Sequence, residues 1–352
     1  MKIGIMTFHW AANYGAILQT YSLVNYLQNQ FHADVEVIDY YPRNLAYSYK
    51  NAIRQIKPGS IWRKLKENRK YRLLAPFRDK LPASKRYYTN DDLMQADLEY
   101  DIIVAGSDQI WNPYFLLYGE NKITPAYYLN FAKEPVRKIA VSASFGCHVF
   151  PSECDNIVIP LLQKFHSISV RENTGAHILM SLGFESVPVT ADPTALMSKE
   201  LCEQLCAPAP VISPGTVSKF ILRKQTPAAR KLIKSIFRAY SEDRIADIDY
   251  LPLSDWLSAI RDSKLVITNS FHCVLMCLKL HTPFAVLLEN GANAGMNDRF
   301  ITLLDMFQLS DRIIRNSSDI ANLSKSIDFN KTDEAMERYS YTLKSYIERN
   351  IC

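Results

Sequence analysis

Residues 264–280, KLVITNSFHCVLMCLKL, constrain the fold more than any other stretch of the chain. An apolar run at 265–268, rich in β-branched residues, indicates a buried strand, and a second apolar run at 274–280 is typical of a helix packed on a sheet. The polar turn between them would lie at the carboxyl edge of an α/β sheet, where such folds bind ligands and helix amino-termini accept anions. The turn contains His272, a candidate general acid and base. The simpler alternative is a helix-entry histidine bonded to the backbone.

The same alternation of apolar strand, polar loop and helix recurs along the chain, and it predicts parallel doubly wound sheets. The predicted strands are residues 1–7, 35–40, 100–106, 137–144, 167–170, 187–192, 219–223, 265–268 and 284–288. The predicted helices are residues 17–27, 174–182, 228–240, 255–262, 296–307 and 339–350.

At 352 residues the chain exceeds the usual size of one core, and the Pro-rich stretch 207–214 is typical of a linker. We therefore expect an N-terminal domain at 1–206, with a basic helical insertion at about 44–90. A smaller domain would follow at 207–330. A last helix at 331–352 would pack back on the first domain.

Composition excludes several classes of protein. The chain is 48% hydrophobic and 22% charged, as in ordinary globular proteins, and has no run of 18 apolar residues. Its start, MKIGIMTFHW, does not resemble a signal peptide. Seven cysteines without a CxxC pair suggest reduced thiols and no zinc site. We expect a cytoplasmic protein without a metal.

Positive charge concentrates in residues 50–86, which contain 13 Lys and Arg residues and only two acidic residues. A solvated helical face is the simplest interpretation. The alternative is a cationic surface for anionic lipid or a pyrophosphate-bearing acceptor, which would place the protein at the inner face of the membrane. Nucleic acid is not indicated, because no recognised module accompanies the patch.

Other predicted strand ends in the first domain also carry polar groups. Asn13 and Gly15 follow the first strand without a GxGxxG pattern, so a dinucleotide is not indicated. An N-cap and a packing glycine are the alternatives at those two positions. The remaining candidates from strand ends are Ser144, Arg171 and the loop residues Asp108, Gln109, Trp111 and Asn112. Loops of this kind carry function more often than they merely connect, and Arg171 suits a carboxylate or phosphate.

An ordered set of motifs resembles the polysaccharide pyruvyl transferase family. The motifs are TFHWAANYGAILQTYSL, DYYP, AGSDQIWNP, SASFG, SVREN, ADPT, AIRDSKLVITNSFHC and NDRFITLLDMFQLSDR. The resemblance implies two Rossmann-like domains in a GT-B-like arrangement with an interdomain active-site cleft. It also implies transfer of pyruvate from phosphoenolpyruvate to sugar hydroxyls as a ketal, on a surface glycan such as an exopolysaccharide or its lipid-linked precursor, without a cofactor.

The resemblance also implies roles for individual residues. His272 would be the general acid and base, with Arg171 gripping an anionic group of the donor. The expected donor contacts are Asn13, Gly15, Ser144, Arg171, Ser270, Phe271 and Arg299. The expected acceptor contacts are Asp108, Gln109, Asn112 and Trp111, the last as a flat platform for the sugar.

Two positions depart from the family pattern: Ser270, where some members have Arg, and Cys273, where Gly is frequent. Arg299 is the candidate to replace the missing cation. Two other functions remain open. One is a GT-B glycosyltransferase that uses a nucleotide sugar, with Glu289 on the ribose. The other is a non-catalytic binding protein of a glycan-assembly complex.

Overall fold

The computed structural model describes residues 1–42, 61–113, 125–222, 225–240, 243–289 and 297–351. These residues form two compact units, Met1–Leu196 with Tyr339–Cys352 and Met197–Arg338, and each is considered by itself. The basic insertion expected at about 44–90 and the membrane-contact segment at 50–86 lie partly outside the described residues.

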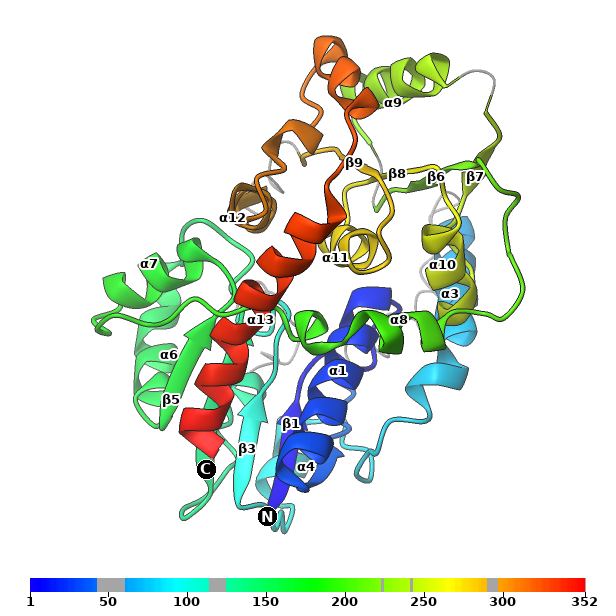
Figure 1. Cartoon of the computed structure of the whole chain (residues 1–352). Helices are drawn as coiled ribbons and strands as arrows, with labels where there is room; N and C mark the ends of the chain where they lie inside the picture. The colour runs from blue at the N-terminus through cyan, green and yellow to red at the C-terminus, as the bar shows by residue number, and fades with distance from the viewer. Residues whose placement is uncertain (43–60, 114–124, 223–224, 241–242, 290–296, 352) are drawn as a thin grey trace. The chain divides into compact units, whose positions relative to one another are not determined.

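The first unit contains a five-stranded parallel sheet in the order β2-β1-β3-β4-β5. Strands β1, β3 and β5 are labelled in Figure 1. Its strands are β1 (Lys2–Met6), β2 (Asp34–Val37), β3 (Ile102–Ala105), β4 (Arg137–Ala143) and β5 (Ser167–Val170). The connections run outward in opposite directions from β1 and β3, so the topological switch point lies between those two strands. Ligands of open α/β sheets bind beyond the carboxyl ends of the strands at such a point.

The helices of the first unit are α1 (Tyr14–Phe31), α3 (Ile61–Arg78), α4 (Asn90–Met94), α6 (Asp155–Leu162) and α7 (Asn173–Ser181). Asn13 begins α1 as its N-cap, because its side chain accepts the Gly15 N–H at 3.0 Å. In α3, Lys70 is buried over the Tyr14 ring. At least one cation of the basic segment therefore packs inward instead of facing solvent.

The second unit has a four-stranded parallel sheet in the order β7-β6-β8-β9 (Figure 1). Its strands are β6 (Val217–Phe220), β7 (Ile245–Asp247), β8 (Leu265–Thr268) and β9 (Phe284–Val286). Its helices are α8 (Lys199–Leu205), α9 (Pro227–Ala239), α10 (Leu253–Arg261), α11 (Phe271–Lys279) and α12 (Asp298–Met306). The switch point here lies between β6 and β8, and every residue of α11, which follows β8, is buried.

One predicted strand does not form. Residues 187–192 make a single bridge, between Val170 and Val189, instead of a strand. The reason is that their backbone bonds to side chains: Ala191 N–H donates to Thr342 Oγ1, and Asp192 N–H donates to Tyr339 Oη, both at 3.0 Å. The segment then continues into a short 3-10 helix.

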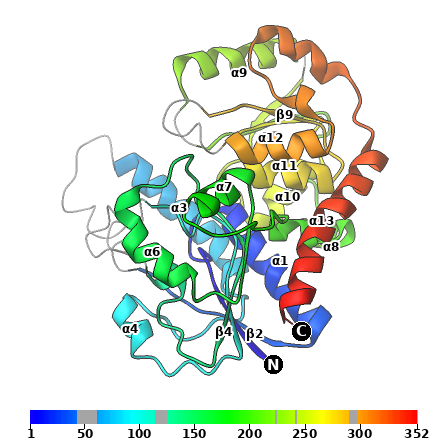
Figure 2. The ribbon, with the colours of Figure 1, turned by 90° about the vertical axis from the view of Figure 1, so that its left-hand side faces the viewer.

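The terminal helix α13 (Phe329–Ile351) begins ten residues before the helical pattern predicted at 339–350 and two residues before the expected C-terminal segment 331–352. Its C-terminal part belongs to the first unit and lies against β4 and β5, where Tyr346 Oη donates to the Ala140 carbonyl at 3.0 Å. The same part runs beside α1, with Tyr26 Oη at 3.5 Å from Glu348 (Figure 2).

Across the described ranges, no helix is both long and apolar enough to span a bilayer. Six cysteines are described, and all six are free thiols.

We expect Leu343→Ala to lower the free energy of unfolding by about 2–5 kcal/mol, because this α13 side chain is fully buried and its truncation leaves a cavity. Urea denaturation measures the change. Tyr341→Ala is the control on the same helix, since Tyr341 is 67% exposed and its loss should cost less than about 0.5 kcal/mol. Equal losses in the two variants would contradict the packing of α13 on the first sheet.

Candidate functional site

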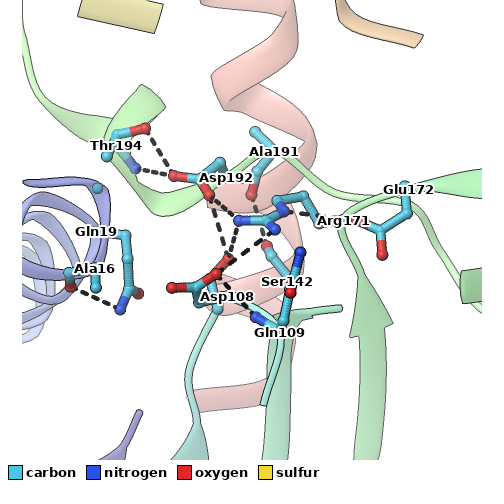
Figure 3. A network of polar contacts seen from close by, with 12 residues as sticks. Ala16, Gln19, Asp108, Gln109, Ser142, Arg171, Glu172, Ala191, Asp192 and Thr194 are labelled. Carbon is cyan, nitrogen blue, oxygen red and sulfur yellow. Dashed lines mark hydrogen bonds and ion pairs between the residues drawn. The ribbon is translucent and has the colours of Figure 1, made fainter. Parts of the chain in front are cut away.

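The carboxyl edge of the first sheet is organised around a buried arginine (Figure 3). Arg171 follows β5, and its Nη1 donates to Asp192 Oδ2 at 2.7 Å. Its Nε lies 3.6 Å from Glu172 Oε2, and its Nη2 lies 4.0 Å from Asp108 Oδ1. The side chain of Arg171 is completely inaccessible to solvent. Burial alone would lower the pKa of Arg171, but the three carboxylates outweigh it and raise this pKa.

The loop after β3 is fixed by the same network. Asp108 has a φ of 76°, a left-handed conformation that is uncommon for a residue other than glycine. Its carbonyl accepts the Ser144 N–H at 3.0 Å, and its carboxylate accepts the Gln109 N–H at 2.9 Å. The bonds between the ends of β3 and β4 therefore hold Asp108 in this strained backbone conformation.

Two roles that we expected from the sequence do not fit the structure. Arg171 was expected to grip the donor, but its guanidinium is buried among three carboxylates, which make the local charge negative and repel an anion. Trp111 was expected to be a sugar platform, but it has no exposed surface. Its ring stacks on Tyr128 at 5.5 Å, and its Nε1 donates to the Tyr127 carbonyl at 3.1 Å. Both residues instead stabilise the fold of the sheet edge.

The other first-domain candidates divide between buried and accessible groups. Ser144 and Asn112 are almost fully buried, and Gly15 is buried inside the first turn of α1. Asn13 and Gln109 remain partly exposed. The side chain of Gln109 passes so close to Gly146 that a Cβ there would lie 2.6 Å from Gln109 Cδ. Of the expected polar contacts in this domain, Asn13 and Gln109 thus keep accessible side chains.

A second network at this edge was missed from the sequence. His9 follows β1, with Nδ1 at 3.2 Å from the Thr7 carbonyl and Nε2 at 3.0 Å from Asp39 Oδ1. The ring therefore bridges the Thr7 carbonyl and the Asp39 carboxylate, both of which are acceptors. Arg86 Nε donates to the other oxygen of Asp39 at 2.8 Å. The available signal was positional, since His9 follows the predicted strand 1–7 and Asp39 lies near the end of the predicted strand 35–40.

In the second unit, the end of β8 leads directly into the amino-terminus of α11. Ser270 is the N-cap, and its Oγ accepts the Cys273 N–H at 3.4 Å. His272 lies in the first turn, 5% exposed, with its ring edge-on to Phe271 at 5.6 Å. The guanidinium of Arg299, from α12, lies 5.5 Å from the centre of the Phe271 ring. The structure therefore brings Ser270, Phe271, His272 and Arg299 together.

Asn269 holds this edge in place. Its Oδ1 accepts the Leu222 N–H at 2.7 Å, and its Nδ2 donates to the Leu222 carbonyl and to Glu289 Oε1 at 2.9 and 2.7 Å. The loops after β6, β8 and β9 are thereby joined through one amide side chain. Beside Glu289 lies a cavity of about 610 Å³, whose lining includes Lys231, Asn297 and Arg315.

Comparison with known proteins identifies the family. A family model for polysaccharide pyruvyl transferases matches residues 13–290, which is more than half of the chain. The chain belongs to the polysaccharide pyruvyl transferase family. The resemblance read from the motifs is confirmed, and with it the assignment as a transferase enzyme of polysaccharide modification. A search among curated proteins found no match.

Solved structures of UDP-N-acetylglucosamine 2-epimerases are similar to this pyruvyl transferase family member in fold. The Rickettsia bellii enzyme has a TM-score of 0.53 at 8% identity, covering 99% of this chain and 97% of that one. The Neisseria meningitidis enzyme, bound to UDP-GlcNAc, has a TM-score of 0.52 at 10% identity, covering 99% of both chains. S. aureus MnaA with UDP has a TM-score of 0.52 at 13% identity, and the match covers 98% of this chain and 94% of that one. These matches and the two parallel sheets confirm the GT-B-like class with two Rossmann-like domains. The interdomain active-site cleft stays a prediction.

Replacing Arg171 by Met in this pyruvyl transferase family member should lower the free energy of unfolding by about 3–5 kcal/mol, since it leaves buried carboxylates without their cation. Chemical denaturation measures the loss. Arg338→Met is the matched control, because the Arg338–Glu334 pair is exposed and should contribute less than about 1 kcal/mol. A fully stable Arg171→Met protein would show that the arginine is not a structural residue.

The Asp39 carboxylate should make stability depend on pH in acid. Burial alone would raise the pKa of Asp39, but the bonds and charges of His9 and Arg86 outweigh it and lower this pKa. The folded state therefore binds fewer protons than the unfolded state, in which Asp titrates near about 3.9. The resulting stability is present above that value and is lost as pH falls through the folded pKa.

The stability difference between wild type and Asp39→Asn should therefore be larger at pH 6 than at pH 2.5 in urea titrations. Asp79→Asn is the control, since its side chain is 68% exposed and its effect should change little over that range. A constant difference for Asp39→Asn would contradict the role of this carboxylate.

Proposed function

We propose that the protein transfers the pyruvyl group of phosphoenolpyruvate to a sugar as a ketal, with the donor bound at the amino-terminus of α11. The observation that carries this proposal is the convergence of His272, Arg299 and that helix terminus at the carboxyl end of β8. A helix terminus stabilises an anion through its N–H groups, and a guanidinium binds carboxylate or phosphate through two parallel bonds. Phosphoenolpyruvate carries both anionic groups.

Arg299 suits the donor better than Arg171 does. Arg299 lies over the faces of Phe271 and Phe300, with its guanidinium at 5.5 Å from each ring centre, and aromatic faces stabilise a cation. It is also partly exposed, whereas Arg171 is buried among acids. In this proposal Arg299 replaces the cation that some family members carry at the position of Ser270.

The proposed reaction has two additions. His272 protonates the methylene carbon of phosphoenolpyruvate, and the neighbouring carbon becomes an oxocarbenium-like centre. A sugar hydroxyl attacks this centre and gives up its proton, which restores the acid. The bond to phosphate then breaks, and a second hydroxyl of the sugar closes the ketal while its proton leaves with inorganic phosphate. No oxidant, reductant or metal takes part in this scheme.

The acceptor in this proposal is a sugar or a lipid-linked oligosaccharide of a surface-glycan pathway. Reaction at the inner face of the membrane would suit such a precursor, with the basic residues in 50–86 contacting anionic lipid. In this proposal the enzyme is cytoplasmic and takes its phosphoenolpyruvate from the cytoplasm, on the same side of the membrane as the acceptor.

A second candidate function is transfer from a nucleotide sugar. It is favoured by the cavity of about 610 Å³, which offers the Glu289 carboxylate for a ribose and Lys231 and Arg315 for phosphates. The similar epimerases are named for UDP-GlcNAc, and one of them is bound to it. A uridine nucleotide is therefore the first ligand to test.

Thermal-shift titration separates the two functions. Phosphoenolpyruvate at about 100 times its dissociation constant should stabilise the native state by about 2.7 kcal/mol, because it binds only the folded protein. The shift should disappear in Arg299→Ala and persist in Arg315→Ala, the matched arginine of the cavity. In a phosphate-release assay with a glycoside diol, His272→Ala should lower kcat by about 10²–10⁴.

A shift with UDP-GlcNAc that disappears in Arg315→Ala, with none from phosphoenolpyruvate, would establish the second candidate instead. Full phosphate release by His272→Ala would remove the histidine from the mechanism.

A further inference from the structure

The end of β1 carries an aromatic surface that the donor site does not use. We call it the aromatic shelf, and define it as Phe8, Trp10 and Tyr41. The Trp10 ring contacts Phe8 at 5.7 Å and 58° and Tyr41 at 5.5 Å and 73°. Trp10 and Tyr41 are partly exposed, while Phe8 is nearly buried beneath them. Phe8 and Trp10 follow β1 and Tyr41 follows β2, so the shelf lies beyond the carboxyl ends of these two strands, and β1 borders the switch point where this kind of sheet binds ligands.

The orientation of Trp10 is fixed from below. Its Nε1 donates to Tyr127 Oη at 3.2 Å, and Tyr127 is fully buried with its ring edge-on to Phe8 at 4.8 Å. A polar anchor on the inner edge of an indole leaves the rest of the ring as a rigid apolar surface. Such preorganisation lowers the entropic cost of binding a ligand.

A cation borders the shelf. The Arg86 guanidinium lies 5.2 Å from the centre of the Tyr41 ring, and its Nε is held by Asp39, which His9 fixes from the other side. The Arg86 side chain is 43% exposed. Among the described residues none accepts a hydrogen bond from its two Nη groups, so they can bind a ligand that rests on the shelf.

We infer that the aromatic shelf and Arg86 bind the pyranose ring of the acceptor. One face of a pyranose presents C–H groups that pack on an indole, while its hydroxyl or carboxylate substituents reach outward to hydrogen-bond donors. The shelf and Arg86 offer both features side by side. This inference rests on the proposed function for the identity of the acceptor, and it gives the shelf the platform role that the buried Trp111 cannot fill.

Phosphoenolpyruvate fits the shelf poorly, because it has no extended apolar face to cover Trp10. The shelf is therefore an acceptor surface and not a second donor site.

Saturation-transfer NMR with methyl β-D-galactopyranoside, methyl α-D-mannopyranoside and methyl β-D-glucuronide tests the inference on the whole protein. Irradiation of aromatic protons should transfer to the ring C–H protons of at least one glycoside. The signal should fall at least tenfold in Trp10→Ala and several-fold in Trp10→Phe, which keeps the packing on Phe8. Tyr341→Ala, which removes an exposed aromatic ring elsewhere, should leave the signal unchanged.

The outcomes separate this inference from the proposed function. Trp10-dependent glycoside binding without a thermal shift from phosphoenolpyruvate would keep the shelf as a sugar site and remove the proposed donor. A phosphoenolpyruvate shift retained in Trp10→Ala, with loss of glycoside binding, supports both. No transfer to any of the three glycosides, or transfer unchanged in Trp10→Ala and Trp10→Phe, overturns the inference.

Discussion

The buried ion-pair network of Arg171 determines the structure of the first carboxyl edge. Desolvating a guanidinium costs several kcal/mol unless carboxylates surround it, so the segments that carry Asp192 and Asp108 must close on the end of β5. Asp192 extends this constraint, because its N–H bonds to Tyr339 and places the C-terminal part of α13. The strained φ of Asp108 is then a consequence of reaching the arginine from the loop after β3.

In the second unit, the loops at the carboxyl edge of the sheet are joined without a buried arginine. Asn269 uses one amide to join the loops after β6 and β9, and the bonds it makes are neutral except for the one to Glu289. This bridge uses no cation, and the guanidinium of Arg299 lies 5.5 Å from the centre of the Phe271 ring in the first turn of α11. The two sheets therefore share a strand order, but a buried ion-pair network joins the loops of the first edge and an amide side chain joins those of the second.

The parallel strands were predictable, because strands buried on both faces are continuous apolar runs between polar turns. The Arg171 network was not, since its main partner Asp192 lies 21 residues away and pairing across a sheet edge leaves no local pattern. Trp111 looked functional because polar residues flank it, yet its ring packs on Tyr128 in the core. At His272 the local strand–turn–helix pattern was sufficient, so the position could be predicted.

The difference between the two arginines shows how a strand-end cation can be assigned to structure or to ligand binding. Arg171 is among three carboxylates, and the net negative charge of that cluster disfavours any anion brought to it. Arg299 rests on the faces of Phe271 and Phe300, which stabilise the cation through their quadrupoles. In the proposed function, the guanidinium and the helix amino-terminus would bind the dianionic donor from two sides. The sequence shows an arginine at both places, and the surrounding charge decides which one a ligand can use.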